Sequence, residues 1–445
     1  MGQSESKKKW WIKGSNVPKR DEKQVYVKDF ADLPKEVQKM VVSIPRELMD
    51  QNFEVLLSTV RFVTRRTIKR QKYVQDRIQA QAQQAKQKGG ASAPAEEEAA
   101  EESASTLEQP DENESISIDF SASMDIDANG NAVPRNPVTR TNTNMTIDAM
   151  AEQLINRNQN PRKLFKIIKT AGKGGFARVY KAKNLSGKPQ KVAIKKLPHK
   201  TPEEKRANVD EIYWLKNCVH DNIVKYLGAF EVKDEIWISM EFMDGGTLGE
   251  AVKSCIFEES QIAYVARECL KGLKFLHSQG IIHRDMKSGN IMMTTDGTIK
   301  LIDFGLCCHM TADRKRMVGS PYWIPPEMVL KQEHNTAADI WSTGICMLEM
   351  AYGQPPEKDS PIKCMFMSAI GKPPRLTDED KEEWSPQFRD FISKMLEFHQ
   401  QKRATADQLL EHPFIATADT QQSMKHIIEH IFIEKNLYDH SGMAT

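Results

Sequence analysis

The spacing of apolar positions changes along the chain, and each change predicts a different kind of structure. Leu33 to Val42 forms a Pro-started amphipathic run, which predicts a helix. A second run has helical spacing, at Leu48, Phe53, Leu56, Leu57, Val60 and Val63. Its basic continuation predicts either a solvated helix face or one that touches an acidic surface. Residues 89–138 then have almost no aromatic side chains, so they cannot bury enough surface to fold.

From residue 145 onward the pattern is that of a folded domain. Met145 and Met150 flank Thr146 as a hydrophobic staple, which predicts a helix with Leu154 and Ile155 on one side. Runs rich in β-branched residues predict strands over 164–168, 192–195 and 236–240. Apolar positions 262, 265, 269, 273 and 276 predict a core helix over 261–277. A further helix is predicted around Met424, Ile427, Ile428 and Ile431.

The formal net charge of +2 hides two opposed blocks. Residues 1–88 carry 20 Lys and Arg against 10 Asp and Glu, whereas residues 89–134 carry 12 acids and no base. The acidic block predicts a linker extended by its own repulsion. Seven cysteines without a CxxC spacing argue against a zinc site or a disulfide framework and favour a reducing compartment. Because no eighteen-residue apolar run and no signal-peptide core occur, we expect neither secretion nor a membrane span.

The first residues combine two signals for attachment to a membrane. Gly2 with Ser6 fits the N-myristoylation signal, and the run Lys7-Lys8-Lys9-Trp10-Trp11 would add the electrostatic and interfacial contact with anionic lipid that one acyl chain needs. The alternative is a basic tail left after removal of Met1. We therefore expect a cytoplasmic protein that Gly2 acylation would hold at the inner face of the plasma membrane.

Two short motifs carry residues suited to phosphoryl transfer. The first is His283-Arg284-Asp285-Met286-Lys287-Ser288-Gly289-Asn290, and the second is Asp303-Phe304-Gly305. Asp285 would accept the proton of a substrate hydroxyl, with Lys287 beside the transferred group. Asn290 and Asp303 carry the hard oxygens that Mg²⁺ prefers. The alternative is that Asp285 and Asp303 are ordinary solvated loop acids. The thirteen residues from Asn290 to Asp303, with a hairpin-like sequence between them, argue against it.

A glycine-rich loop and a lysine upstream of these motifs predict a site for nucleotide phosphates. The loop reads Gly172-Lys173-Gly174-Gly175-Phe176-Ala177-Arg178-Val179, where backbone N–H groups could approach phosphates and Val179 could cover adenine. The run Val192-Ala193-Ile194-Lys195 ends in the lysine suited to the α and β phosphates. Its expected partner on the next helix is Glu211, with Asp210 as the rival.

These motifs together resemble the protein kinase family over roughly residues 160–415. The resemblance implies an α+β, bilobal protein kinase fold, with a small β-rich N-lobe and a large helical C-lobe. It implies ATP and Mg²⁺ as cofactors, with Mn²⁺ as an alternative metal. It adds Ala193, Met240, Glu241, Met243 and Met292 to the nucleotide site, with backbone groups of Glu241 and Met243 at the hinge. Ala177 departs from the family pattern, which has a third glycine there.

The resemblance also implies supporting roles around the site. His283 would stack against Phe304, and Glu327 would pair with buried Arg403 at the end of the activation segment, residues 303–327. Asp339 would open a helix that anchors the catalytic loop. Glu349 on the same helix would either face basic residues of the substrate or form an internal ion pair.

Within the family, the chain resembles the Ser/Thr-specific PAK kinases of the STE group, which Rho-type GTPases activate. The resemblance is carried by residues 145–148, by Met317-Val318-Gly319-Ser320-Pro321-Tyr322-Trp323 and by the N-terminal helix pair, which resembles the PAK autoinhibitory segment. Residues 10–32 contain Pro18 and Phe30 but no His of the GTPase-binding motif, which argues against a Rho-type small GTPase as partner.

Arg316 is a second departure, because PAK kinases have their activating Thr at this position. A phosphate there would pair with Arg284, whereas Arg316 would repel it. We therefore predict activity that does not depend on phosphorylation at residue 316. The segment would be ordered by another contact, such as a partner's acids or a phosphorylated Thr311.

The predicted organisation is a basic N-terminal anchor (1–24), a mostly helical regulatory segment with an autoinhibitory role (25–88), a disordered acidic linker (89–144), a pre-kinase helix (145–163), the kinase domain (164–415), and a C-terminal helix and tail (416–445). The expected function is ATP-dependent Ser/Thr protein phosphorylation of PAK-like type, in cytoskeletal or Rho-GTPase-linked signalling. Protein substrates with basic residues before the target Ser are expected. The alternative is a signalling scaffold with a catalytically weak kinase fold. No module for reading nucleic acid is recognisable, so we expect no nucleic-acid partner.

Overall fold

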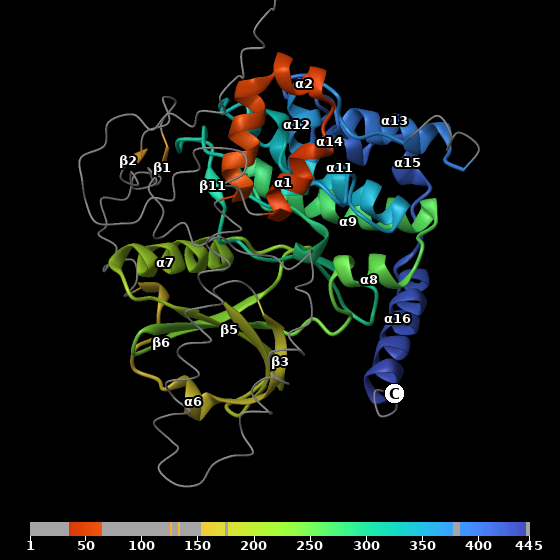
Figure 1. Ribbon diagram of the computed structural model, residues 1–445. Helices are drawn as coiled ribbons and strands as arrows, with labels where there is room; N and C mark the ends of the chain where they lie inside the picture. The colour runs from red at the N-terminus through yellow and green to blue at the C-terminus, as the bar shows by residue number, and fades with distance from the viewer. Residues whose placement is uncertain are drawn as a thin grey trace, which may run out of the picture.

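The computed structural model describes residues 35–64, 125–126, 132–133, 153–173, 177–376 and 383–441. These ranges form a sheet-based small lobe and a helical large lobe (Figure 1), which confirms the predicted α+β kinase fold. The predicted anchor at 1–24 lies outside the described residues. Among the helices of the described ranges, none combines the length and the apolar character that crossing a lipid bilayer would require.

The small lobe is a five-stranded antiparallel sheet with the strand order β3-β4-β5-β7-β6. The strands are β3 (Phe165–Lys173), β4 (Arg178–Asn184), β5 (Lys191–Pro198), β6 (Tyr226–Val232) and β7 (Glu235–Glu241), which include all three predicted strands. Helix α7 (Pro202–Asn217) lies beside this sheet (Figure 1). It begins at a capping box in which Thr201 and Glu204 satisfy each other's backbone N–H groups. Its buried side includes Ile212 and Glu211.

Helices dominate the large lobe. They are α8 (Leu248–Ser254), α9 (Glu259–Ser278), α10 (Pro326–Val329), α11 (Ala337–Tyr352), α12 (Pro361–Ala369), α13 (Pro386–Met395), α14 (Ala406–Leu410), α15 (Pro413–Ala416) and α16 (Gln421–Ser441), with the 3₁₀ turns η2 (Ser288–Asn290) and η3 (Pro321–Trp323). Two short antiparallel pairs complete it: β8 (Ile281–Ile282) with β11 (Cys308–His309), and β9 (Ile291–Met293) with β10 (Ile299–Leu301). The core helix predicted over 261–277 is α9, and its five apolar positions are fully buried.

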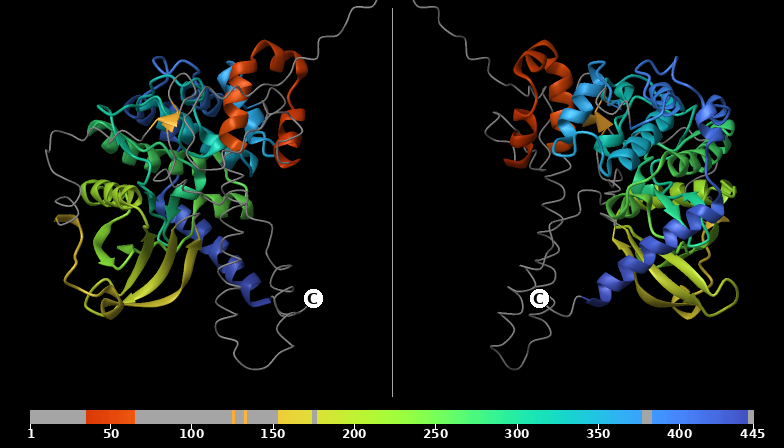
Figure 2. Two further views of the ribbon diagram at one scale, coloured as in Figure 1. Left: turned by 60° about the vertical axis from the view of Figure 1, so that its left-hand side comes forward. Right: turned by 90° about the vertical axis from the view of Figure 1, so that its right-hand side faces the viewer.

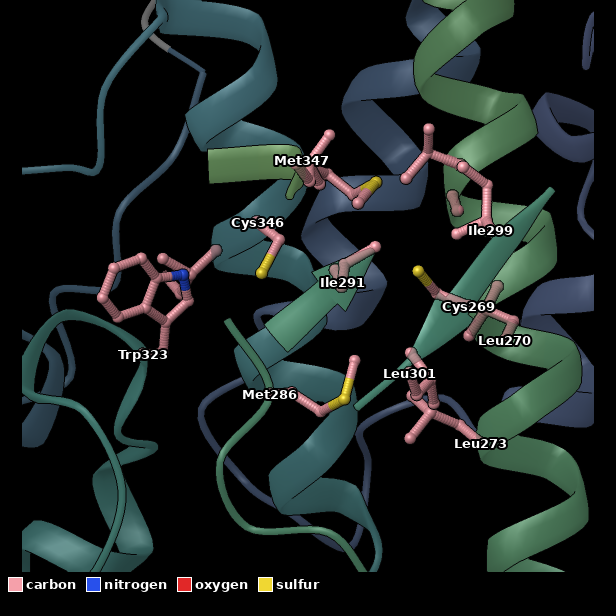
Figure 3. Packing of buried hydrophobic residues seen from close by; sticks show 14 of the residues in the cluster. Cys269, Leu270, Leu273, Met286, Ile291, Ile299, Leu301, Trp323, Cys346 and Met347 are labelled. Atoms are coloured by element: carbon pink, nitrogen blue, oxygen red, sulfur yellow. The ribbon is translucent and has the colours of Figure 1, made fainter. Parts of the chain in front are cut away.

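The main hydrophobic core fixes the β9–β10 hairpin between helices (Figure 3). Leu270 and Leu273 of α9 lie beside Leu301 of β10, and Met347 of α11 belongs to the same core. Asn290 comes directly before β9, and Asp303 follows β10 after a single residue. Packing of this hairpin therefore positions the two predicted metal ligands.

The predicted C-terminal helix is α16, and it packs on the large lobe as expected. Met424, Ile428 and Ile431 are buried in the main core. Ile428 lies so close to Gly245 that a Cβ built on this glycine would be 2.9 Å from Ile428 Cγ2. Position 245 must therefore lack a side chain for α16 to pack against it.

The pre-kinase segment differs from the predicted helix over 145–163. Residues 145–152 lie outside the described ranges; residues 153–154 are helical, and the chain then turns away at Ile155. Asn156 pairs with Phe230 at the edge of β6, and the short helix α6 (Pro161–Leu164) follows. The side chain of Asn156 accepts hydrogen bonds from the backbone N–H groups of residues 158 and 159, and such bonds compete with helix formation. Asn160 caps the N-terminus of α6, so a new helix begins there.

Two other predicted segments are described only in part. Within the acidic linker at 89–144, β1 (Asp125–Ile126) pairs with β2 (Ala132–Val133), which differs from the expected absence of secondary structure. The Asn129-Gly130 sequence between them is typical of hairpin turns. The remainder of the linker lies outside the described residues.

The N-terminal segment forms a helical unit against the large lobe (Figure 2). It consists of α1 (Lys35–Val42), α2 (Arg46–Gln51) and a helix over 53–64. The second predicted helix is thus divided at Asn52, whose side chain donates to the carbonyl of Leu48 at 3.1 Å. We call residues 35–64 the N-terminal hairpin. The rest of the predicted 25–88 segment lies outside the described residues.

The hairpin has its own hydrophobic contact with the large lobe. Val41, Ile44 and Leu56 share a buried cluster with side chains of α10, α12 and the activation segment, among them Val318, Ile324, Met328, Ile362 and Phe366. Ser360, the N-cap of α12, also donates to the carbonyl of Met40 at 3.0 Å. The hairpin therefore covers the face of the lobe that adjoins the activation segment.

Candidate active site

The loop after β8 is held in place by Asp339, at the start of α11. Its carboxylate accepts from the backbone N–H groups of His283 at 2.9 Å and Arg284 at 2.8 Å, and from His277 Nε2 at 2.9 Å. Burial alone would raise the pKa of Asp339, but the hydrogen bond from His277 and the nearby charges outweigh it, so this pKa is lowered. Arg284 has φ of +65°, a strained conformation for a residue with a side chain. The ionised Asp339 holds this strained turn together, as the predicted anchor would.

The turn aims Asp285 into a buried polar cluster. Asp285 Oδ2 lies 3.0 Å from Lys287 Nζ and accepts from Asn290 Nδ2 at 2.9 Å. Ser320 Oγ donates to Asp285 Oδ1 at 3.0 Å and accepts from Lys287 Nζ at the same distance. The sequence analysis missed Ser320 as a site residue. It lies 35 positions after Asp285, and only the folded activation segment brings the two together.

A second charged cluster joins the small lobe to the Asp303-Phe304-Gly305 motif. Lys195 Nζ, on β5, lies 2.7 Å from Glu211 Oε1 on α7 and 3.0 Å from Asp303 Oδ1. Burial would lower the pKa of Lys195, but the two carboxylates outweigh burial and raise it. Burial would raise the pKa of Asp303, but the charges of Lys195 and Lys287 lower it to about 2. Lys195 and Asp303 are therefore ionised at neutral pH, whereas burial raises the pKa of Glu211 against the opposing charge of Lys195. Glu211, rather than its rival Asp210, meets the lysine.

The register of the sheet brings the other predicted nucleotide residues together. Val179 of β4 lies opposite Lys195, and Ala193 lies opposite Met240 of β7. Glu241 ends β7, Met243 is buried just after it, and Met292 of β9 bridges to Thr247. Gly172 and the buried Ala177 flank the glycine-rich loop. Gly174, Gly175 and Phe176 lie outside the described residues, as does the side chain of Lys173.

The two predicted metal ligands lie at the base of one hairpin. The backbone N–H of Ile302 donates to the carbonyl of Asn290 at 3.0 Å. Asp303 follows Ile302 directly, so this bond holds the two predicted ligands near each other. The Nδ2 group of Asn290 donates to Asp285, which leaves its Oδ1 as an acceptor of the kind that Mg²⁺ prefers. The ring of Phe304 meets His283 edge-on, with centroids 5.3 Å apart, where stacking was predicted.

Comparison with known proteins agrees with this geometry. The model of the family described as "Protein kinase domain" matches residues 165–415, more than half of the chain. The chain belongs to the protein kinase domain family.

Its relatives include two Dictyostelium discoideum proteins. The "Probable serine/threonine-protein kinase mkcC" is 45% identical over 289 residues, 64% of this chain and 32% of that protein. The protein named mkcB with the same description is 46% identical over 278 residues, 62% of this chain and 38% of that protein. "Serine/threonine-protein kinase STE20" of Debaryomyces hansenii is 38% identical over 274 residues, 61% of this chain and 25% of that protein. The chain thus spans well under half the length of these relatives.

The end of the activation segment of this kinase domain is fastened by a buried ion pair. Arg403 donates two hydrogen bonds to the Glu327 carboxylate, at 2.8 and 3.0 Å, and a third to the carbonyl of Ala337. Both side chains are almost fully buried. The predicted pair is therefore present, in the bidentate geometry that Arg and carboxylate favour.

Of the two roles considered for Glu349, the internal ion pair is absent among the described residues, and contact with basic substrate residues stays a prediction. Its side chain is fully buried in α11, and Ser288 Oγ donates to its Oε1 at 2.7 Å. Burial raises the pKa of Glu349 to about 7 despite this bond and the more distant charge of Lys253. Near neutral pH this carboxyl is therefore partly protonated, unlike a surface acid poised for basic substrate residues.

We expect Glu349 to make the folding stability of the kinase domain pH-dependent. A pKa raised from 4.5 to about 7 means that the folded state holds the proton more tightly, so stability falls as pH rises between these values, by up to about 3 kcal/mol. Glu349→Gln should remove this loss, whereas Glu429→Gln on the surface of α16 should retain it. Urea unfolding from pH 5 to pH 8 measures the slope, and equal slopes in native chain and Glu349→Gln would contradict the assignment.

Proposed function

We propose that the chain is a Ser/Thr protein kinase of PAK-like type, which transfers the γ-phosphoryl group of ATP to hydroxyl groups of protein substrates. The observation that carries the proposal is the contact of Asp285 with Lys287, Ser320 and Asn290. A buried carboxylate fixed by three donors is positioned to receive a proton from a hydroxyl that approaches along the activation segment. The STE20 relative supports the PAK-like type.

Each cluster has its own part in the proposed reaction. Lys195, held by Glu211, would contact the α and β phosphates, and hinge residues Glu241 and Met243 would bind adenine. Bound Mg²⁺ would neutralise charge on the phosphate oxygens. Asn290 and Asp303 fit such an ion, because one amide oxygen and one carboxylate leave room for phosphate and water ligands. Lys287 would sit beside the transferred group, and the likeness to serine/threonine-protein kinases supports a Ser/Thr hydroxyl as acceptor.

Phosphoryl transfer by the full-length chain tests this proposal. With γ-labelled ATP and Mg²⁺, we expect label on a peptide that carries Arg before a single Ser. Lys195→Ala should reduce the rate by about a hundredfold or more, because one preorganised charge at the phosphates is lost. Lys200→Ala is the matched control, since it removes the same charge from an exposed position close by. If the native chain and Lys195→Ala label the peptide equally, the scaffold function takes the place of the enzyme.

We further propose that the N-terminal hairpin restrains the kinase domain. The hairpin packs on Met317 and Val318, which directly precede Gly319 and Ser320 of the catalytic cluster. A protein substrate that approaches Asp285 along this segment would meet the hairpin. Undocking would expose the apolar surface of α12, so the docked state is favoured until a partner or membrane competes for the hairpin.

Leu56→Asp should raise the activity of the full-length chain. Leu56 is fully buried in the contact with the large lobe, and a charge there should undock the hairpin and increase the rate about tenfold. Gln51→Asp adds the same charge at an exposed position of α2 and should leave the rate unchanged. A Leu56→Asp variant that is correctly folded and no more active than Gln51→Asp would exclude restraint by this contact.

A further inference from the structure

The activation segment contains a basic run, Arg314-Lys315-Arg316, and the sequence predicts that a contact other than a phosphate on residue 316 orders it. Arg284, in the His283-Arg284-Asp285 motif, donates a hydrogen bond from its Nε to the carbonyl of Leu306 at 2.6 Å. Arg316 cannot carry a phosphate. The structure of the described segment is therefore held by groups of the chain itself.

Arg314 provides the most extensive of these contacts. Its Nε donates to the carbonyl of His334 at 2.8 Å, its Nη1 donates to the carbonyl of Ala312 at 3.2 Å, and its Nη2 pairs with the Glu333 carboxylate. In return, the His334 N–H donates to the carbonyl of Arg314 at 3.1 Å. The Arg314 side chain is only 12% exposed. The Arg314 guanidinium thus links the activation segment, at Ala312, to Glu333 and His334 in the loop that precedes α11.

That loop is itself fixed to the large lobe. The carbonyl of Glu333 accepts from Gln400 Nε2 at 2.9 Å. The His334 ring is fully buried, and burial together with the charges of Arg284 and Arg314 lowers its pKa to about 3, so it stays neutral and packs as an apolar group. Five residues later, Asp339 holds the backbone of His283 and Arg284. The Arg314 contact therefore ends in the loop directly before α11, the helix whose first turn fixes the catalytic loop through Asp339.

We propose that Arg314 is a positioning residue that holds the activation segment in its substrate-accepting path, in the role that a phosphorylated side chain would otherwise fill. A guanidinium with three hydrogen bonds can replace a phosphate here because it finds its acceptors in backbone carbonyls and Glu333 instead of in Arg284. Such a segment is ordered without prior phosphorylation. The proposal rests on the proposed kinase function.

The test compares Arg314→Ala with Lys315→Ala in the full-length, phosphatase-treated chain. Both variants lose one positive charge, but Lys315 is exposed. We expect Arg314→Ala to lower kcat/KM for the protein substrate by about 10- to 100-fold, because hydrogen bonds of a charged group are lost. The affinity for ATP should stay within about twofold, since Lys195 is not touched. Millimolar guanidinium should restore part of the activity of Arg314→Ala, and ammonium should not.

Two outcomes would overturn the assignment. One is equal activity of Arg314→Ala and Lys315→Ala, and the other is loss of native activity on phosphatase treatment alone, which would place the ordering role on a phosphate such as one at Thr311. Hydrogen exchange of amides 306–318 gives a readout that does not depend on catalysis. Exchange should be faster in Arg314→Ala and unchanged in Lys315→Ala. If the native chain shows this exchange pattern but no kinase activity, the kinase function is rejected and the Arg314 contact is retained.

Discussion

Asp285→Asn should reduce phosphoryl transfer to a protein substrate by about a thousandfold, within the range of 10² to 10⁴ that a positioned general base contributes. The amide keeps the shape of the carboxylate, but its single oxygen can replace only one of the two oxygens that accept from Ser320 and Asn290. The amide cannot take a proton from the attacking hydroxyl. It also leaves Lys287 without its buried counter-charge. The loss should be in kcat, because the groups expected to bind ATP lie around Lys195 and the hinge.

Steady-state kinetics with saturating ATP measure this effect. Asp234→Asn, at an exposed turn between β6 and β7, is the matched control and should be as active as the native chain. A thermal unfolding curve for each variant separates lost chemistry from lost folding. An Asp285→Asn variant that is folded and retains a tenth of the native rate would remove Asp285 from the role of proton acceptor.

Glu327→Ala should destabilise the kinase domain by about 3 to 5 kcal/mol, the cost of leaving one member of a buried ion pair uncompensated. Arg403 would keep its bonds to the carbonyls of Ala337, Glu397 and Phe398 but lose both bonds to the carboxylate. The guanidinium is fully buried and cannot regain water without opening the lobe. Since native domains are stable by only about 5 to 15 kcal/mol, this single change removes a large share of the margin.

Urea unfolding at neutral pH gives the free energy directly. Glu429→Ala serves for comparison, because Glu429 is exposed on α16 and its pairing with Lys425 at 3.7 Å should contribute less than about 1 kcal/mol. If the two variants unfold at the same urea concentration, the Glu327–Arg403 pair does not fasten the lobe as argued.

The sequence alone was sufficient to predict a feature where that feature depends on neighbouring residues or on a repeated spacing of apolar positions. The buried face of α7 pointed to Glu211 because helical periodicity places that carboxyl beside the apolar positions. The five apolar positions of α9 followed from the same rule. Each of these inferences depends only on the order of residues within one helix, which the sequence gives directly.

Contacts between distant segments could not be predicted in this way. Ser320 meets Asp285, and Arg314 meets Glu333, only after the activation segment has folded back on the large lobe. The end of the pre-kinase helix was missed for a different reason. The apolar spacing through Ile155 favoured a helix, but the bonds of the Asn156 side chain to nearby backbone N–H groups outweighed that preference.

The main hydrophobic core extends beyond both ends of the family match at 165–415, since it includes Ile155 on one side and Met424, Ile428 and Ile431 on the other. The family match thus leaves out residues that help to build the main hydrophobic core of this chain. A recombinant fragment limited to residues 165–415 would lose these four buried side chains, and the apolar surface that they cover would become exposed to solvent. Fragments intended for crystallisation or screening should therefore start before residue 153 and continue past residue 431.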